Sequence, residues 1–461
     1  MVNIGVSVIS KETIKPSAAS SSLQLLKPYK LSIFDQLTPT TYVPMLFFYP
    51  IIDPYVNLPQ TLTQLKSAFS QTLTLYYPFA GRTKNNLYIH EFDAGVPYLE
   101  ARVNCRMFDF LGLQETELLN DFVPFHPFRM ETGSELEMPL IGVQVNVFDG
   151  GLAIGVSFSH KLIDAVTANA FLKSWAAVFR GSRDRIIHPN LSHASLVFPP
   201  RDDLPTKYLA LMERLWFEEK NYVTRRIVFD TKAISALQHK AKSEHVPKPS
   251  RIEALTCFLW KHQMAASRAL SSGTSTRLSI AVHAVNMRPR MNVQTLKDNI
   301  IGNIFWWAPV LLDLTAESSD HELCDLVNVL NESLKEFNSD YLETLKGNEG
   351  FGGICDFLNL IQEVISLEPA PEIYAFTSWT RILDQVDFGW GRPFWIGVMG
   401  KVGHAFRNLT VFIEKQCDQG IEAWVTLDQK QMVMLEKDPQ FLAFASPNRK
   451  ISSTIFSNGD D

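Results

Sequence analysis

The sequence predicts a mixed α/β protein built from two domains, and three observations support this fold class. Segments with the period of strands alternate with segments with the period of helices in both halves of the chain. The length of 461 residues exceeds what one ordinary hydrophobic core supports. The composition, 46% hydrophobic and 20% charged, is that of a soluble globular protein. We expect one domain over residues 1–200, a crossover linker over residues 201–222, and a second domain over residues 223–461.

The first half is predicted to contain a long helix, a β-hairpin and a second helix. Apolar residues recur at helical spacing over residues 62–75. Valines alternate with polar residues over 143–147, and Asp149-Gly150 supplies turn residues before a second strand at 152–160. Helical spacing returns over residues 165–179. Smaller predicted features of this half are a strand over residues 5–9 and a buried apolar run that ends at Pro50.

The second half shows the same alternation of strand and helix patterns. Strands are predicted over residues 226–230, 278–285, 409–413 and 420–427, and residues 304–314 form a strongly apolar run. Helices are predicted over residues 231–242, 250–260, 320–345 and 428–445. Ser250 and Glu253 stand at the spacing of a capping box, which marks the start of a helix. Residues 347–353 are rich in glycine, so that we expect a flexible loop there.

Composition and charge argue against several classes of function. The net charge is −6, the isoelectric point is near 6.0, and there is no basic run with interleaved aromatic residues. These features argue against a nucleic-acid partner. No window has the length of a transmembrane helix and the first residues lack a secretory-signal pattern, so we expect no membrane association. Five scattered cysteines without a Cys-x-x-Cys pair indicate free thiols and a cytoplasmic location.

His160 is the strongest candidate for a catalytic residue. It has the same parity as Leu152, Ile154, Val156 and Phe158, so that it ends an apolar row on one face of the predicted strand. Asp164 follows four residues later, where the next helix begins. A histidine at such a strand-to-helix corner is partly desolvated, stays largely neutral at pH 7 and can accept a proton. On spacing alone the pair has a structural alternative, since a His-x-x-x-Asp pair is frequent by chance.

The motifs that the chain lacks narrow the chemistry. There is no Gly-x-Ser-x-Gly nucleophile elbow, no cluster with metal-ligand spacing, no P-loop and no dinucleotide fingerprint. We therefore expect no metal and no permanently bound cofactor. The chemistry that remains for a lone histidine is general base catalysis, in which it deprotonates a hydroxyl or amine that attacks an activated carbonyl.

Seven short motifs resemble those of one family, the plant BAHD acyl-CoA-dependent acyltransferases. His160-Lys-Leu-Ile-Asp164 matches the family's His-x-x-x-Asp motif, and Asp387-Phe-Gly-Trp-Gly391 matches its second signature motif. The others, in chain order, are Tyr77-Pro-Phe-Ala-Gly-Arg82, Ser250-Arg-Ile-Glu-Ala-Leu255, Asn286-Met-Arg-Pro-Arg290, Gly302-Asn303 and Thr377-Ser-Trp379. The resemblance runs from about Val8 to Leu435, and two signature motifs in the expected order make it specific. The start of the chain is similar to a branch whose members mostly acetylate alkaloids and terpenoids.

The resemblance implies a fold, a reaction and roles for individual residues. The fold would be that of chloramphenicol acetyltransferase, two similar-sized domains with a channel between them. His160 would be the general base, and Asp164 would pair with Arg288 to hold the histidine loop. Thr377 and Trp379 would line the acceptor site and stabilise the oxyanion. Asp387, Gly389 and Gly391 would form a structural turn on the side where CoA binds, and Ser250 and Arg251 would meet the CoA phosphates.

The implied activity is that of a monomeric O-acyltransferase. The co-substrate would be an acyl-CoA, most simply acetyl-CoA, and the acceptor would be a hydroxyl of a bulky plant specialised metabolite in an apolar pocket. Residues 291–296 depart from the Pro-Pro stretch that relatives carry, which puts acceptor contacts near Gly302-Asn303 in doubt. An N-acyltransferase, a thioesterase and an inactive small-molecule-binding protein on the same scaffold stay open as alternatives.

Overall fold

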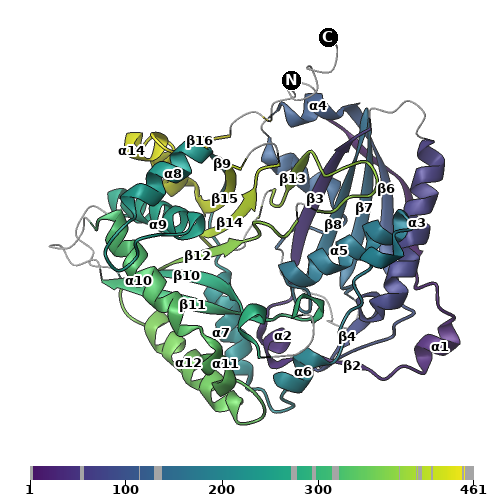
Figure 1. The fold of residues 1–461 in the computed structure, drawn as a ribbon, viewed down its shortest axis with the longest axis horizontal. Coiled ribbons are helices and arrows are strands. Elements are labelled where there is room, and N and C mark those ends of the chain that lie inside the picture. The colour runs from purple at the N-terminus through teal and green to yellow at the C-terminus, as the bar shows by residue number, and fades with distance from the viewer. Residues whose placement is uncertain are drawn as a thin grey trace.

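The computed structural model describes residues 4–51, 57–113, 115–128, 138–270, 278–292, 297–313, 321–383, 385–400, 402, 407–416, 419–448 and 451. These residues form a mixed α/β fold, as the sequence predicts, with two large sheets that lie side by side (Figure 1). A small sheet joins β2 (Tyr29–Lys30), β5 (Tyr88–His90) and β4 (Arg82–Lys84). No helix in these ranges is long and apolar enough to cross a lipid bilayer.

The first large sheet is built mainly from the first half of the chain. Its strand order is β1 (Val6–Ile14), β6 (Val96–Arg106), β7 (Ile141–Asp149), β8 (Gly151–Ser159), β3 (Tyr42–Pro50) and β13 (Trp395–Gly397). Strands β7 and β8 form the predicted antiparallel hairpin, in which Val143 faces Val156. Strand β8 is buried along its whole length, and β7 and β3 pair with its two edges in the middle of the sheet.

Two helices of the first half pack against each other on this sheet. They are α3 (Leu58–Leu75) and α5 (Ala165–Phe179), both close to their predicted bounds. The indole nitrogen of Trp175 donates a 3.1 Å hydrogen bond to the carbonyl of Leu65, and its ring contacts Phe69 at 4.9 Å between centroids. The contact fixes the helix that begins just after His160.

The second large sheet belongs to the second half. Its order is β11 (Phe305–Asp313), β10 (Leu278–Asn286), β12 (Glu372–Ser378), β14 (Leu409–Glu414), β15 (Ile421–Asp428), β9 (Tyr222–Phe229) and β16 (Ser446–Pro447). Helices α8 (Thr231–Lys240), α10 (Leu323–Glu336) and α13 (Gln429–Leu435) pack around α9 (Arg251–Leu270). Strand β12, which has no counterpart among the predicted elements, pairs in parallel with β10 and β14.

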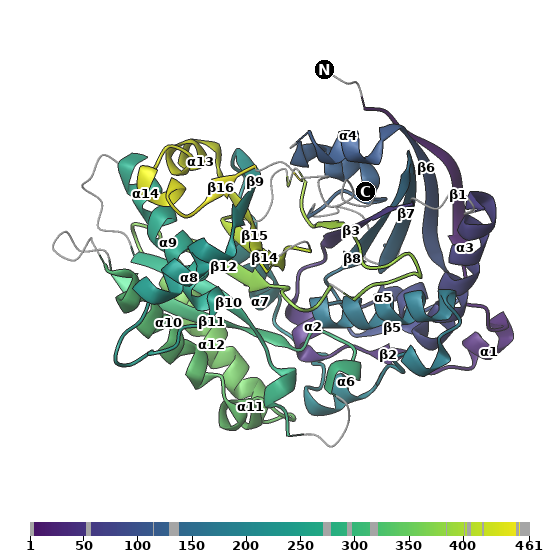
Figure 2. The ribbon, with the colours of Figure 1, turned by 45° about the horizontal axis from the view of Figure 1, so that its top comes forward.

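The two halves are tied together by strand β13 and by the predicted linker. Strand β13 comes from the second half of the sequence, yet it pairs antiparallel with β3, where Ile396 faces Phe47 (Figure 1). Figure 2 shows the two large sheets side by side in a second view. The linker contains an ordered helix, α7 (Thr206–Trp216), whose Trp216 contacts Trp307 at 4.3 Å between ring centroids, with the ring planes tilted by 39°. The halves therefore share structure, and the domain boundaries at residues 200 and 223 stay predictions.

The structure corrects three predictions for the second half. The predicted flexible loop at residues 347–353 contains the start of α12 (Gly350–Ile365); Gly350 is needed there because a Cβ would lie 2.2 Å from the Leu345 carbonyl carbon. The predicted helix 320–345 is two helices, α10 and α11 (Ser339–Thr344), because Asn338 caps a new start. The predicted final helix divides into α13 and α14 (Pro439–Leu442), since proline cannot continue a helix.

The remaining elements are short. They are the helices α1 (Ser20–Gln24), α2 (Ile33–Leu37), α4 (Met107–Leu111) and α6 (His193–Val197), and the 3₁₀ turns Tyr77–Ala80, Thr116–Phe122, Arg183–Arg185, Arg288–Arg290 and Lys297–Asn299.

Candidate active site

His160 lies at the corner between a central strand and a helix, as the sequence predicts. Strand β8 ends at Ser159, and the His160 amide donates a 2.8 Å hydrogen bond to the carbonyl of Thr41. The helix α5 begins at Ala165, with Asp164 as its N-cap. The imidazole lies 5.5 Å from the ring of Phe305, which belongs to the second half of the chain. The histidine is therefore held between the two large sheets.

A cavity lined mainly by apolar side chains opens beside His160. Its wall is built from both halves of the chain: β3 and α5 on one side, and β10, β11, β12 and β14 on the other. The lining residues with polar or aromatic groups are Phe128, Phe158, His160, Asp164, Asn286, Phe305, Trp307, Thr377, Ser378 and Trp379. Thr377 and Trp379 lie 217 and 219 positions after His160 in the sequence, yet all three residues line one cavity.

Thr377 and Trp379 bring two hydrogen-bond donors to this cavity. Thr377 is near the end of β12, and the Trp379 backbone amide is fixed by a 2.8 Å hydrogen bond to Phe412. Within the described ranges, neither the Thr377 hydroxyl nor the Trp379 indole nitrogen has a hydrogen-bond partner. The neighbouring Ser378 hydroxyl forms a 2.9 Å hydrogen bond with the Thr380 hydroxyl, and the hydrogen bonds of the described residues do not join it to His160. The donors are thus available to a bound molecule.

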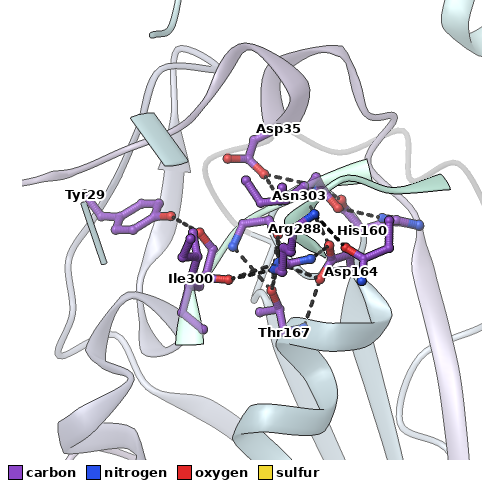
Figure 3. A network of polar contacts seen from close by, with 12 residues as sticks. Tyr29, Asp35, His160, Asp164, Thr167, Arg288, Ile300 and Asn303 are labelled. Carbon is purple, nitrogen blue, oxygen red and sulfur yellow. Dashed lines mark hydrogen bonds and ion pairs between the residues drawn. The ribbon is translucent and has the colours of Figure 1, made fainter. Parts of the chain in front are cut away.

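Asp164 forms the ion pair with Arg288 that the family resemblance implies. Nη1 of Arg288 donates to Oδ2 of Asp164 at 2.6 Å, and Nη2 donates to Oδ1 at 3.2 Å. Oδ1 also accepts from the Thr167 amide at 2.9 Å, and Oδ2 accepts from the Ile304 amide at 3.1 Å. Asp164 therefore binds protein groups on both oxygens and does not reach the His160 ring (Figure 3).

The Arg288 side chain also holds the segment at residues 300–302, which precedes β11. Its Nε and Nη2 donate to the carbonyl of Ile300 at 3.2 and 2.9 Å, and Nη2 also donates to the carbonyl of Gly302 at 2.9 Å. Arg288 is fully buried, with 0% of its side chain exposed. A buried guanidinium needs such a complete set of acceptors, because its charge is not solvated.

At neutral pH, Asp164 and His160 are kept in different charge states by their surroundings. Burial opposes ionisation of Asp164, yet the Arg288 guanidinium and the two backbone amides hold its pKa below the ordinary value of 3.8. Burial lowers the pKa of His160 below its ordinary 6.5, opposed only in part by its own backbone carbonyl, by Asp164 and by Asn303. The site thus contains a carboxylate and a neutral imidazole.

Asn303 and Asp35 complete the surroundings of His160. Sequence reasoning gave Asp35 no role and named Asn303 only as part of the Gly302-Asn303 motif. The Asn303 side-chain oxygen lies 3.2 Å from Nδ1 of His160, and its nitrogen donates to the His160 carbonyl at 2.8 Å. Asp35 accepts from the Asn303 backbone amide at 2.7 Å. One local signal existed: Ser32 and Asp35 have capping-box spacing, and Asp35 is an acid within an apolar stretch.

Asp387, Gly389 and Gly391 form a turn outside the cavity. Oδ1 of Asp387 accepts from the amides of Gly389 at 2.7 Å and Gly391 at 3.0 Å, and Oδ2 pairs with Arg180 at 3.0 Å. Both glycines have positive φ, 98° and 89°. The intervening Phe388 contacts Trp175 of α5 at 5.1 Å between centroids. The motif therefore attaches a segment of the second half to the end of α5.

The side chains of Ser250 and Arg251 are already engaged in protein contacts. The Ser250 hydroxyl accepts from the Glu253 amide at 3.1 Å, and the Ser250 amide donates to the Glu253 carboxylate at 2.8 Å, which is the predicted capping box. Arg251 pairs with Glu414 at 2.8 Å and donates to the carbonyl of Gln419 at 3.1 Å. A phosphate at this place would have to compete with Glu414 for the guanidinium.

Comparisons with known proteins identify the family. A family model described as the Transferase family matches residues 4–442. Akuammiline synthase 2 of Alstonia scholaris is 35% identical over 97% of this chain and 98% of its own length. Limonoid 7-O-acetyltransferase of Citrus sinensis is 35% identical over 95% of this chain and 98% of its own. The crystal structure of vinorine synthase aligns with a TM-score of 0.79 and 31% identity, over 96% of this chain and 99% of that one.

The family model, the relatives and the shared fold identify an acyltransferase. The chain belongs to the BAHD acyltransferases, the Transferase family, and is an acyl-CoA-dependent enzyme.

Proposed function

We propose that this protein is an O-acyltransferase that moves an acetyl or other short acyl group from acyl-CoA to a hydroxyl of a plant specialised metabolite. The observation that carries the proposal is the cavity that neutral His160 shares with the unpaired donors of Thr377 and Trp379. A base and oxyanion donors around one small space are what direct acyl transfer requires. The names of the relatives, among them a limonoid 7-O-acetyltransferase, support acetyl transfer to such an acceptor.

In the proposed reaction, Nε2 of His160 accepts the proton of the acceptor hydroxyl. The acceptor oxygen attacks the thioester carbonyl carbon, and the carbonyl oxygen becomes an oxyanion that Thr377 and Trp379 stabilise as donors. The C–S bond then breaks, the ester is formed, and CoA leaves as its thiol after taking the proton from His160. No acyl-enzyme is involved, and the bonding of Ser378 to Thr380 instead of His160 supports direct transfer.

Asp164 is assigned a positioning role in this proposal. Its carboxylate is held by Arg288 and by the Thr167 and Ile304 amides, so it orders the start of α5 and the segment at Gly302. It is not a charge relay, because its oxygens do not contact the imidazole. Asp387, Gly389 and Gly391 are assigned a structural role, and the Ser250–Arg251 region is kept as the site near which CoA phosphates bind.

The acceptor is proposed to be a bulky, largely apolar alcohol, such as an alkaloid, a terpenoid or a quinone derivative. Aromatic residues of both halves line the cavity, among them Phe128, Phe305 and Trp307. Such a wall suits a large apolar body with one reactive hydroxyl. An amine acceptor would use the same base and donors, so an N-acyltransferase is the alternative that an acceptor panel must separate.

The enzyme is further proposed to be a cytoplasmic monomer. A single chain supplies His160, Thr377 and Trp379 to the same cavity, so the site needs no second subunit. Four of its five cysteines lie in the described ranges and are free thiols, which suits a reducing compartment.

The test is CoA release from acetyl-, isobutyryl-, isovaleryl-, malonyl- and coumaroyl-CoA against pooled alcohols and pooled amines. The proposal predicts release that needs an alcohol, with ester detected by mass spectrometry and a short-chain donor preferred. Release without an acceptor would indicate a thioesterase, and amide products would indicate N-acylation. Absence of release with every pair, from folded protein that binds acyl-CoA, would favour the binding-protein alternative.

A further inference from the structure

The orientation of the Asn303 side chain can be assigned from its partners (Figure 3). Its Nδ2 donates to the His160 carbonyl at 2.8 Å and to Oδ1 of Asp35 at 3.0 Å. A carbonyl oxygen and a carboxylate oxygen only accept hydrogen bonds. The NH₂ group of Asn303, and not its amide oxygen, must therefore face them. The amide oxygen consequently faces Nδ1 of His160, at 3.2 Å.

This orientation fixes the tautomer of the histidine. The Asn303 amide oxygen is only an acceptor, and the His160 carbonyl is a second acceptor beside the same ring. Nδ1 of His160 therefore carries the proton when the imidazole is neutral, which leaves the lone pair on Nε2. A general base needs this lone pair for the acceptor proton, while a ring in the other tautomer would present an N–H there.

Asp35 holds Asn303 in this orientation from the other half of the chain. Its Oδ1 accepts both the backbone amide of Asn303 at 2.7 Å and the side-chain amide at 3.0 Å, across 268 positions of sequence. Its Oδ2 accepts from the amide and the hydroxyl of Ser32, each at 2.8 Å. Asp35 is 0% exposed, and both of its carboxylate oxygens accept hydrogen bonds from protein groups. Two donors of Asn303 on one oxygen prevent the amide from rotating.

We infer that Asp35 is a positioning residue for acyl transfer: acting through Asn303, it keeps the proton of His160 on Nδ1 and leaves Nε2 free to act as the base. This inference rests on the proposed function. The other charged groups near the pair are Asp164, which Arg288 neutralises, and Lys161, which donates to the Gln36 carbonyl at 3.1 Å. Neither contacts the imidazole nitrogens, so Asn303 is the side chain through which a neighbouring residue can set the tautomer.

The test compares Asp35→Asn, Asn303→Ala and the double variant with the wild-type enzyme. Each single variant should lower kcat about 10–100-fold with KM nearly unchanged, as loss of an orienting partner does. In Asn303→Ala the acidic limb of kcat/KM should move to lower pH, because the Asn303 amide oxygen is one of the groups that raise the pKa of His160. The double variant should cost no more than Asn303→Ala alone, since Asp35 acts through Asn303.

Asp387→Asn is the matched control, because Asp387 also accepts two amides on one oxygen but lies outside the cavity. It should lower the melting temperature and leave the position of the acidic limb unchanged. The inference is overturned if the Asp35 and Asn303 variants only lower the melting temperature, or if their effects on kcat multiply in the double variant. If the wild-type enzyme itself shows no acceptor-dependent CoA release, the proposed function has failed instead.

A measurement on the unmutated chain guards against variants that do not fold. ¹⁵N-histidine labelling of the full chain, with the His160 signals identified by their loss in His160→Ala, reports which ring nitrogen is protonated. We expect a protonated Nδ1 and an unprotonated Nε2 at pH 8. A protonated Nε2 would overturn the inference whatever the variants do.

Discussion

Asp164 and Arg288 form a buried ion pair that joins positions 124 residues apart in the sequence. Arg288 is fully buried and Asp164 is 7% exposed, so neither charge is well solvated. The pair connects the N-cap of α5, four residues after His160, to the segment that carries Asn303. The geometry of the histidine therefore depends on a contact between the two halves of the chain.

Asp164→Ala should strongly destabilise the fold, because it leaves the Arg288 guanidinium buried without its anion. We expect a loss of about 3–5 kcal/mol in the free energy of unfolding, measured by urea denaturation. Asp164→Leu with Arg288→Met should recover part of this loss. Asp203→Asn, at an exposed pair with Arg201, serves as the control and should change nothing measurable. A loss after Asp164→Ala no larger than that of the control would contradict the role of the pair.

The same pair gives stability a defined dependence on pH. The pKa of Asp164 in the folded protein is held below the 3.8 of an unfolded chain, so its contribution is complete well above pH 3.8 and is lost as the pH falls through the lowered value. Urea denaturation of the wild type and of Asp164→Asn across this range should converge at low pH. Curves that stay equally far apart would argue against an ionised Asp164.

Thr377→Val should test the proposed oxyanion donor. The change keeps the shape of the side chain but removes the hydroxyl, so kcat should fall by about 10²–10³-fold, while KM for acyl-CoA changes little. Steady-state kinetics with a fixed acceptor give both constants. Thr380→Val is the control, because the Thr380 hydroxyl bonds to Ser378 and is not a lining residue of the cavity. Equal losses in both variants would remove Thr377 from the mechanism.

The pH dependence of kcat/KM should reflect a neutral, desolvated base. Burial lowers the pKa of His160 below 6.5, so the enzyme should keep its activity as the pH falls to 6.5 and lose it only at lower pH. The profile is measured with an acceptor that does not titrate in this range. An acidic limb centred at pH 7 or above would show that the imidazolium is stabilised instead.

Ala284→Phe should narrow the cavity from the β10 side. Ala284 lines it opposite α5, and a phenyl ring there would occupy space that a bulky acceptor needs. We expect kcat/KM to fall by about tenfold or more for the largest acceptor and to change little for a small alcohol. Val433→Phe, at an exposed position of α13, is the control. A uniform loss for all acceptors would indicate general damage.

Local sequence signals predicted much of the fold. The helix α5 has its predicted bounds because Asp164 caps its start and Gly181, with φ of 72°, follows its end. The hairpin of β7 and β8 follows from alternation and from Gly150 in the turn. The prediction failed at residues 347–353, because the glycine content suggested flexibility whereas Gly350 serves a close backbone approach to Leu345.

The site was predictable where its residues are close in sequence or belong to a family motif. His160 and Asp164 share a short motif, and the Asp164–Arg288 pair follows from the resemblance. Asp35 and Asn303 contact each other across 268 positions, and no periodicity in one sequence reports such a contact. Their roles follow from the folded structure, in which Asp35 of α2 contacts Asn303 in the segment before β11.

The most direct test of the central claim is acceptor-dependent CoA release by His160→Ala. The matched control is His262→Ala, which removes a buried histidine that pairs with Asp438 at 2.6 Å and does not line the cavity. With acetyl-CoA and an acceptor that the wild type uses, we expect His160→Ala to be folded and to lose release by about 10³-fold or more, while folded His262→Ala keeps wild-type release. Retained release in folded His160→Ala, or equal losses in both variants, would contradict His160 as the general base.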